Sequence, residues 1–125
     1  MANPNIVSVT AIYGTTTFLT PANTAAQVLL SNAASSGLVY KINNIVAANA
    51  FGNTAVDTTV TINNVASGGG TAFPIVSTVS VPADASLIVV DKTTSIYLME
   101  NQSIVVTSGT ASGIAYTLSY ESIAS

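Results

Sequence analysis

The sequence predicts an all-β protein, a single antiparallel β-sandwich of eight or nine short strands of the jelly-roll or immunoglobulin-like kind. Three observations lead to this prediction. Several segments alternate between apolar and polar residues, as half-buried strands do. Clusters of Gly, Pro, Asn, Asp and Ser separate these segments at short intervals. Helix signals are nearly absent, and the 125 residues match the usual length of one domain.

The most regular alternation lies in residues 56–63. Positions 56, 58, 60 and 62 form one predicted face with Val, Thr, Val and Ile, and the intervening positions hold Asp, Thr, Thr and Asn. Residues 73–81 and 114–121 alternate in the same way, with Pro74 near a strand start, where a missing N–H is tolerated. We therefore expect three half-buried strands in these segments.

Three other segments are apolar on both faces, namely residues 87–90, 96–99 and 104–106. Such runs are typical of central strands, or of strands that a neighbouring subunit covers. Residues 6–13 and 27–31 are two further predicted strands.

The apolar pattern of residues 38–50 changes phase in the middle of the predicted strand. Ile42 belongs to the first inward face, and after Asn43 and Asn44 the apolar role passes to Ile45. One extra residue in a strand produces such a shift, so we expect a β-bulge here.

Turn residues separate the predicted strands. They are Gly14 and residues 35–37, 51–53, 67–70, 81–84, 100–101 and 108–113. Residues 1–26 are the least regular part of the chain, and we expect them to form an N-terminal arm or an edge strand. Residues 27–125 are expected to form the β-sandwich domain.

The chain is poor in charge. Charged residues make up 6% of the sequence, and Arg, His, Cys and Trp are absent, whereas an ordinary soluble domain has about 25% charged residues. Without His or Cys, neither a Ser-His-Asp nor a Cys-His catalytic centre can form. Two lysines and a net charge of -3 argue against nucleic-acid binding, which relies on Lys and Arg at the phosphates.

Paired carboxylates are the remaining route to catalysis. Asp91, Glu100 and Glu121 could in principle flank a glycosidic bond. Their positions at turns and strand ends favour a simpler role, in which they keep the surface hydrated. We therefore predict that the protein is not an enzyme.

A bound metal ion or cofactor is not expected either. Asp84 with Asp91, or Asp57 with a loop carbonyl, could offer oxygen ligands to calcium, but no EF-hand loop is present. Residues 68–70 are three glycines, and no predicted helix follows them to bind a phosphate.

Membrane insertion and export are also not expected. The longest apolar runs, such as residues 87–90, are far shorter than the roughly 18 residues of a spanning helix. The amino terminus has no basic region followed by an apolar one, so no signal peptide is predicted.

Five segments between residues 40 and 123 carry a resemblance to a known group of proteins. They read YKINNIVAAN (40–49), VPADASL (81–87), VDK (90–92), IYLMENQSI (96–104) and LSYESI (118–123). With these segments the chain resembles small virion structural proteins of tailed bacteriophages, particularly those that infect cyanobacteria and marine bacteria. The resemblance extends from about residue 38 to the end.

The resemblance implies an all-β, non-enzymatic protein that serves as a head decoration or cement protein, or as a piece of a tail or fibre. It transfers no functional residue, because the shared segments are predicted strands and turns. We therefore expect a capsid decoration protein on the outer surface of the virion that binds the major capsid protein and stabilises the head. The alternatives are a tail, neck or fibre component, and a host-surface or polysaccharide-binding module.

A surface of Thr, Ser, Asn and Ala with few charges suits burial against other proteins, so we also expect a homo-oligomer, with a trimer favoured. The residues predicted for subunit contacts are large and apolar. They are Val7, Val9, Tyr13 and Phe18 in the amino-terminal segment, and Phe51 and Phe73 near loops.

Overall fold

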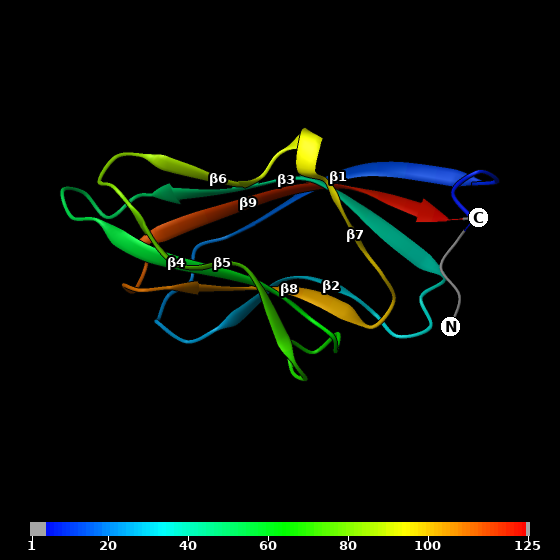
Figure 1. The fold of residues 1–125 in the computed structure, drawn as a ribbon, viewed down its shortest axis with the longest axis horizontal. Coiled ribbons are helices and arrows are strands. Elements are labelled where there is room, and N and C mark those ends of the chain that lie inside the picture. Colours follow the sequence, from blue (N-terminus) through cyan, green and yellow to red (C-terminus); the bar gives the residue numbers. More distant parts are fainter. Residues whose placement is uncertain (1–4, 125) are drawn as a thin grey trace.

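The computed structural model describes residues 5–124, which form two antiparallel sheets packed face to face (Figure 1). The β-sandwich expected from the sequence is therefore confirmed. The strands are β1 (Ala11–Leu19), β2 (Gln27–Asn32), β3 (Leu38–Asn49), β4 (Val56–Asn63), β5 (Ala72–Val81), β6 (Ser86–Val90), β7 (Ile96–Leu98), β8 (Gln102–Ser108) and β9 (Ile114–Ala124). A single 3-10 turn, η1 (Lys92–Thr94), lies between β6 and β7.

The strand order is that of a jelly roll. Sheet A has the order β1-β9-β3-β6, with β7 also paired to β3, and sheet B has the order β2-β8-β4-β5. β1 pairs with β9, β2 with β8, β3 with β6 and β7, and β4 with β5. Together these pairs form one long antiparallel ribbon that is folded over itself. Of the two sandwich types expected from the sequence, the structure has the jelly-roll type.

The core lies between the two sheets. Sheet A contributes Ile42, Ile45 and Leu118, and sheet B contributes Val60 and Ile104, all of which are fully buried. Burial of each such side chain stabilises the fold by about 1.5–3 kcal/mol.

One aromatic residue of the core carries a polar group into the sandwich. Tyr116 of β9 is fully buried, and its hydroxyl donates to the Thr107 carbonyl at 2.9 Å and contacts the Thr58 hydroxyl. Burial raises the pKa of Tyr116 above its ordinary value of 10.0. The two hydrogen-bonding partners belong to β8 and β4, so this side chain ties sheet A to sheet B.

The expected bulge in β3 is confirmed. The register between β3 and β9 shifts between Ile42 and Asn44, so that Asn43 is the extra residue. The shift allows Ile42 and Ile45, three positions apart, both to point into the core. Ser119 donates its backbone N–H to Asn44 Oδ1 at 3.3 Å on the neighbouring strand.

Three strands end in a buried asparagine that binds the backbone of nearby loops or strands. Asn32 ends β2, Asn49 ends β3 and Asn63 ends β4. In each case the side-chain amide donates two hydrogen bonds to backbone carbonyls, while the side-chain oxygen accepts one bond. Buried polar groups must be paired, so these hydrogen bonds fix the conformation of the chain at the ends of β2, β3 and β4.

The predicted strand over residues 6–13 is wrong at its start. Ser8 donates its N–H to the Asn5 carbonyl at 3.1 Å, and Val7 donates to Asn5 Oδ1 at 2.9 Å, so the chain turns here. An asparagine side chain competes in this way with strand hydrogen bonding. The strand β1 begins only at Ala11, and Gly14, expected in a turn, lies within it.

The amino-terminal segment expected as an arm or an edge strand contains β1, which pairs with β9 along its whole length. In the described part of the segment, β1 is therefore an edge strand of sheet A. Residues 1–4 lie outside the described residues.

Two of the three runs that are apolar on both faces are not central strands. Residues 87–90 lie in β6 and residues 96–99 begin with β7, and both strands lie at the edge of sheet A next to β3. The third run, residues 104–106, lies in β8 between β2 and β4 and is buried as expected.

Candidate interaction surface

The acidic side chains contribute to local structure at separate places. Asp91 follows β6, and its Oδ1 accepts hydrogen bonds from the N–H groups of Thr93 at 2.9 Å and Thr94 at 3.2 Å, which caps η1. Glu100 lies in the turn before β8, and its Oε2 accepts the Gly37 N–H at 2.8 Å. Each of these two carboxylates therefore holds a loop in place.

The electrostatics of Asp91 also differ from those of a glycosidase acid. Hydrogen bonds from the side chain and backbone of Thr93 hold the pKa of Asp91 below its ordinary value of 3.8, whereas a general acid needs a raised pKa. Glu121, the third acid considered, lies on β9 directly opposite Lys41 of β3. These observations favour a structural role for the acidic residues.

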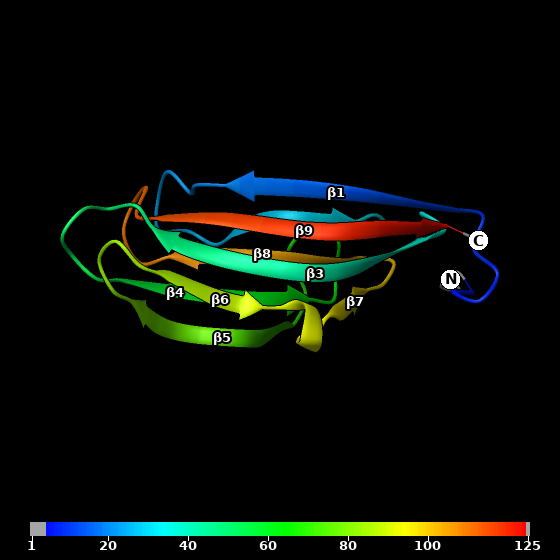
Figure 2. The same ribbon diagram turned by 90° about the horizontal axis from the view of Figure 1, so that it is seen from above.

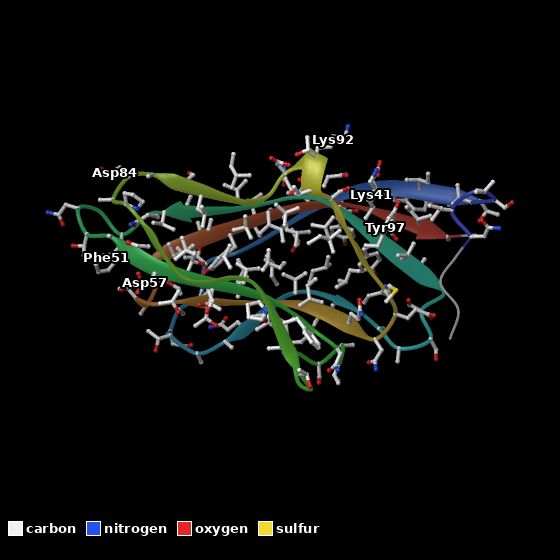
Figure 3. All side chains as sticks on the ribbon, in the orientation of Figure 1. Lys41, Phe51, Asp57, Asp84, Lys92 and Tyr97 are labelled. Atoms are coloured by element: carbon white, nitrogen blue, oxygen red, sulfur yellow. The ribbon has the colours of Figure 1, made fainter. Side chains whose placement is uncertain are left out.

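The candidate calcium ligands do not converge. Asp84 and Asp91 flank β6, whose five residues span about 17 Å, so one ion cannot contact both carboxylates. Asp84 occupies a turn with φ 59° near the end of the sandwich where Phe51 lies (Figure 3). Within residues 5–124, no three His, Cys, Asp or Glu side chains are close enough together to bind a metal ion.

The outer face of sheet A, formed by its side chains that point away from sheet B, gathers exposed apolar residues. Directly paired residues on antiparallel strands share a face. Leu118 of β9 points into the core, so its neighbour Thr117 points outward together with its partners Phe18 of β1 and Val46 of β3. Val46 pairs in turn with Ile88 of β6. Phe18 and Ile88 therefore lie in one row across this face.

A second row crosses the same face. Lys41 of β3 pairs with Glu121 of β9 and with Tyr97 of β7. Because the next residue, Ile42, points into the core, Lys41 and the two residues paired with it point outward. Gly14 of β1 pairs with Glu121 and so belongs to the outer face. Ile12, two positions before Gly14 on the same strand, points to the same face. Figure 2, which looks along the normal of sheet A, shows β1, β9, β3 and β6 side by side.

The outer face of sheet A combines large apolar groups with little charge. Phe18 is 75%, Ile88 62%, Ile12 52% and Tyr97 45% exposed. The strands of sheet A contain only two charged residues, Lys41 and Glu121. Exposed apolar groups gathered on one face are typical of a surface that binds another protein.

The structure does not bring together the residues predicted for subunit contacts. In the amino-terminal segment, Val7 and Val9 lie in the chain before β1. Tyr13 and Phe18 both lie on β1, five positions apart, and therefore point to opposite faces of sheet A. Only Phe18 among these four lies on the outer face of sheet A as part of a strand.

The other two predicted contact residues lie elsewhere. Phe51 follows β3 in a loop at one end of the sandwich (Figure 3), and Phe73 lies on β5 of sheet B. Sequence reasoning missed Ile88 and Tyr97, although both were in segments described as apolar on both faces. The signal was present, but only the pairing of β6 and β7 with β3 shows that one side of these segments points to the outer face of sheet A, which sheet B does not cover.

Comparison with known proteins identifies no relative of this chain. No protein family matches it, no curated protein is significantly similar in sequence, and no solved structure is significantly similar in fold. Within residues 5–124, the chain forms no helix that is long and apolar enough to cross a membrane.

Proposed function

We propose that this protein is a structural component of a tailed-bacteriophage virion, and more specifically a decoration protein that stabilises the head by binding the major capsid protein. The observation that carries the proposal is the outer face of sheet A, which exposes Phe18, Ile88, Ile12 and Tyr97 and whose strands contain only two charged residues. The resemblance of residues 38–125 to small virion proteins supports the same role.

The chemistry of this face suits attachment to a capsid shell. Stable interfaces are richer in apolar groups and poorer in charge than ordinary protein surface. A broad sheet face supplies such contacts on a rigid support, because β9 and β3 in the middle of sheet A are also anchored in the core through Tyr116, Leu118 and Ile45. The proposed role is therefore adhesion through contact.

Low charge has a further consequence for such a protein. Salt weakens contacts between exposed charges, but it does not screen apolar contacts. A decoration protein bound mainly through Ile88, Tyr97 and their neighbours would remain attached at high ionic strength. Binding through basic patches would instead be lost as salt is added.

The test uses capsid shells of the phage that encodes the chain, assembled without this protein. Adding the purified protein should produce binding in co-sedimentation and should raise the temperature at which the shells break. Replacing Ile88 by Ser together with Tyr97 by Ser should weaken binding at least about tenfold, because burial of each side chain contributes on the order of 1.5–3 kcal/mol.

The matched control replaces Phe51 by Ser together with Phe73 by Ser, which removes two exposed aromatic residues away from the outer face of sheet A. This variant should bind like the unmodified protein, and binding should change little with added salt. Failure of the unmodified protein to bind shells would contradict the decoration role. Gold labelling of whole virions that marks only the tail would replace it with a tail or fibre role.

A further inference from the structure

Edge strands are the natural place for one chain to join another, because one side of their backbone has unpaired N–H and C=O groups. Proteins usually block such edges with charges, prolines, bulges or short strands. In this jelly roll the edge strands are β1 and β6 with β7 in sheet A, and β2 and β5 in sheet B.

Three of these edges are blocked. The register of β2 shifts between Val28 and Leu30, and the strand has only six residues. β5 contains Pro74, two register shifts against β4, and Thr78 at φ 50°. β6 and β7 have five and three residues, and η1 separates them.

The fourth edge, β1, has none of these features. Its nine residues, AIYGTTTFL, include no charge and no proline, and they pair with β9 in one unbroken register from Ala11 to Leu19. The middle of the strand, residues 12–16, is exposed on both faces. Among the described strands, β1 pairs only with β9. A regular strand rich in Thr and aromatic residues therefore has one free edge, and its middle is open on both faces.

We infer that β1 is the pairing strand of a two-fold symmetric dimer, in which it pairs antiparallel with β1 of a second copy of this chain. The pairing joins the two copies of sheet A into one continuous sheet. The same patch serves both copies, as a two-fold interface requires.

The strand sequence favours one register, with Thr15 on the two-fold axis. In this register Ile12 lies opposite Phe18 of the second copy, Gly14 lies opposite Thr16, and Thr15 lies opposite itself. It is also the register in which all nine residues of each strand are paired. Ile12 and Phe18 are exposed and share the outer face of sheet A, and apolar pairs directly across two strands stabilise a sheet.

A second copy fits this edge better than the strand of an unrelated protein. The apolar residues Ile12 and Phe18 lie at equal distances on either side of Thr15, so the strand is complementary to itself. Phe18 faces Thr117 within its own chain, and the second copy supplies the apolar neighbour that β9 does not. Because β1 has no charged residue, the pairing brings no like charges together.

Antiparallel pairing of identical strands closes at two copies, so this inference replaces the trimer favoured by the sequence. It does not rest on the virion role, and the free protein in solution tests it. Sedimentation velocity over a wide range of concentrations should show a reversible monomer–dimer equilibrium. A protein that stays monomeric at all concentrations, or a trimer, would overturn the inference.

Thr15→Lys tests the edge itself. It places two like charges opposite each other on the axis, which destabilises a strand pair, while Thr15 is exposed within the monomer. The variant should be monomeric at concentrations where the unmodified protein is a dimer. At dilutions where both proteins are monomeric, the two should have the same unfolding midpoint, because dimerisation no longer stabilises either of them. Ser80→Lys, at an exposed position of β5, is the matched control and should remain a dimer. A dimeric Thr15→Lys protein would overturn the inference.

Thr15→Cys tests the register. The chain contains no cysteine, so oxidised glutathione should link two copies only through this position. The covalent dimer should form much faster than for Ser80→Cys, and equal rates would overturn the register. Shell binding separates this inference from the proposed function. A monomeric protein that binds shells would refute only the dimer, and a dimer that does not bind shells would refute only the decoration role.

Discussion

Replacing Asn32 by Ala should destabilise the fold by about 3 kcal/mol. The Asn32 side chain is fully buried at the end of β2. Its Nδ2 donates to the carbonyls of Leu38 at 3.0 Å and Leu98 at 3.1 Å, and its Oδ1 accepts the Ser36 hydroxyl at 2.6 Å. Each such bond contributes about 1 kcal/mol net, and Ala removes all three. The carbonyl of Leu98, a fully buried residue of β7, would lose this donor.

The loss should be visible in urea unfolding as a lower midpoint at an unchanged slope, and in thermal unfolding as a Tm lower by about 10 °C. Asn53→Ala is the matched control, because Asn53 is exposed and accepts only one long bond, from the Thr54 hydroxyl at 3.5 Å. This control should stay within about 0.5 kcal/mol of the unmodified protein. If Asn32→Ala unfolded at the same midpoint as the control, the three hydrogen bonds of Asn32 would not stabilise the fold.

Asn32→Asp keeps the shape of the side chain and removes its amide donor, so it tests the hydrogen bonds apart from the packing. An ionised carboxylate only accepts hydrogen bonds, so it cannot replace the donation to Leu38 and Leu98. Burial and the two carbonyls should raise the pKa of this carboxyl in the folded state above the unfolded value of about 3.9. The variant should therefore be most stable below that pH and lose stability as pH rises through its folded pKa. Urea midpoints across pH measure this, and a flat profile would contradict the assigned bonds.

Three further predictions concern other parts of the sandwich. Tyr116→Phe removes the hydroxyl that bonds Thr107 and should destabilise by about 1–2 kcal/mol in urea unfolding. Because burial raises the Tyr116 pKa above 10.0, its contribution is present below that pH and lost above it, so the variant should lose less stability in alkaline solution. The lowered pKa of Asp91 gives a contribution that is present above pH 3.8 and lost as pH falls, and Asp91→Asn should weaken this acid dependence in thermal melts. Gly70→Ala should lower the Tm, because φ is 72° and the added Cβ would overlap Asn64 Oδ1, whereas Gly14→Ala, with no atom within 4 Å of its Cβ, should leave the Tm nearly unchanged.

Several strands could be predicted from the sequence because their pattern depends only on the strand itself. In β4 the alternation places Val56 and Val60 inward, and both are buried. The bulge at Asn43 was predictable for the same reason, since an extra residue shifts the apolar period wherever the strand lies. Alternation shows neither which strand lies at an edge nor which side of a fully apolar segment is left uncovered. The edge position of β6 and the exposure of Ile88 on it were therefore not predictable.

The candidate interaction surface was predictable only in part. Phe18 stands out as a large apolar residue that follows three threonines, and it is exposed on the outer face of sheet A. Its grouping with Ile88, 70 positions away in the chain, follows from the chain of pairs through Thr117 and Val46. Such a grouping depends on register and strand order, which one segment alone does not contain.

The amino-acid sequence by itself determined the class of this protein, all-β and poor in charge, because side-chain alternation and composition are local properties of a chain. The tertiary structure decided the rest: the jelly-roll order, the burial of Asn32 and its counterparts, and the open edge at β1. These depend on which strands become neighbours, and that choice minimises the free energy of the whole core. The physical reason is that hydrogen bonds and apolar contacts between distant segments form only once both sheets are in place.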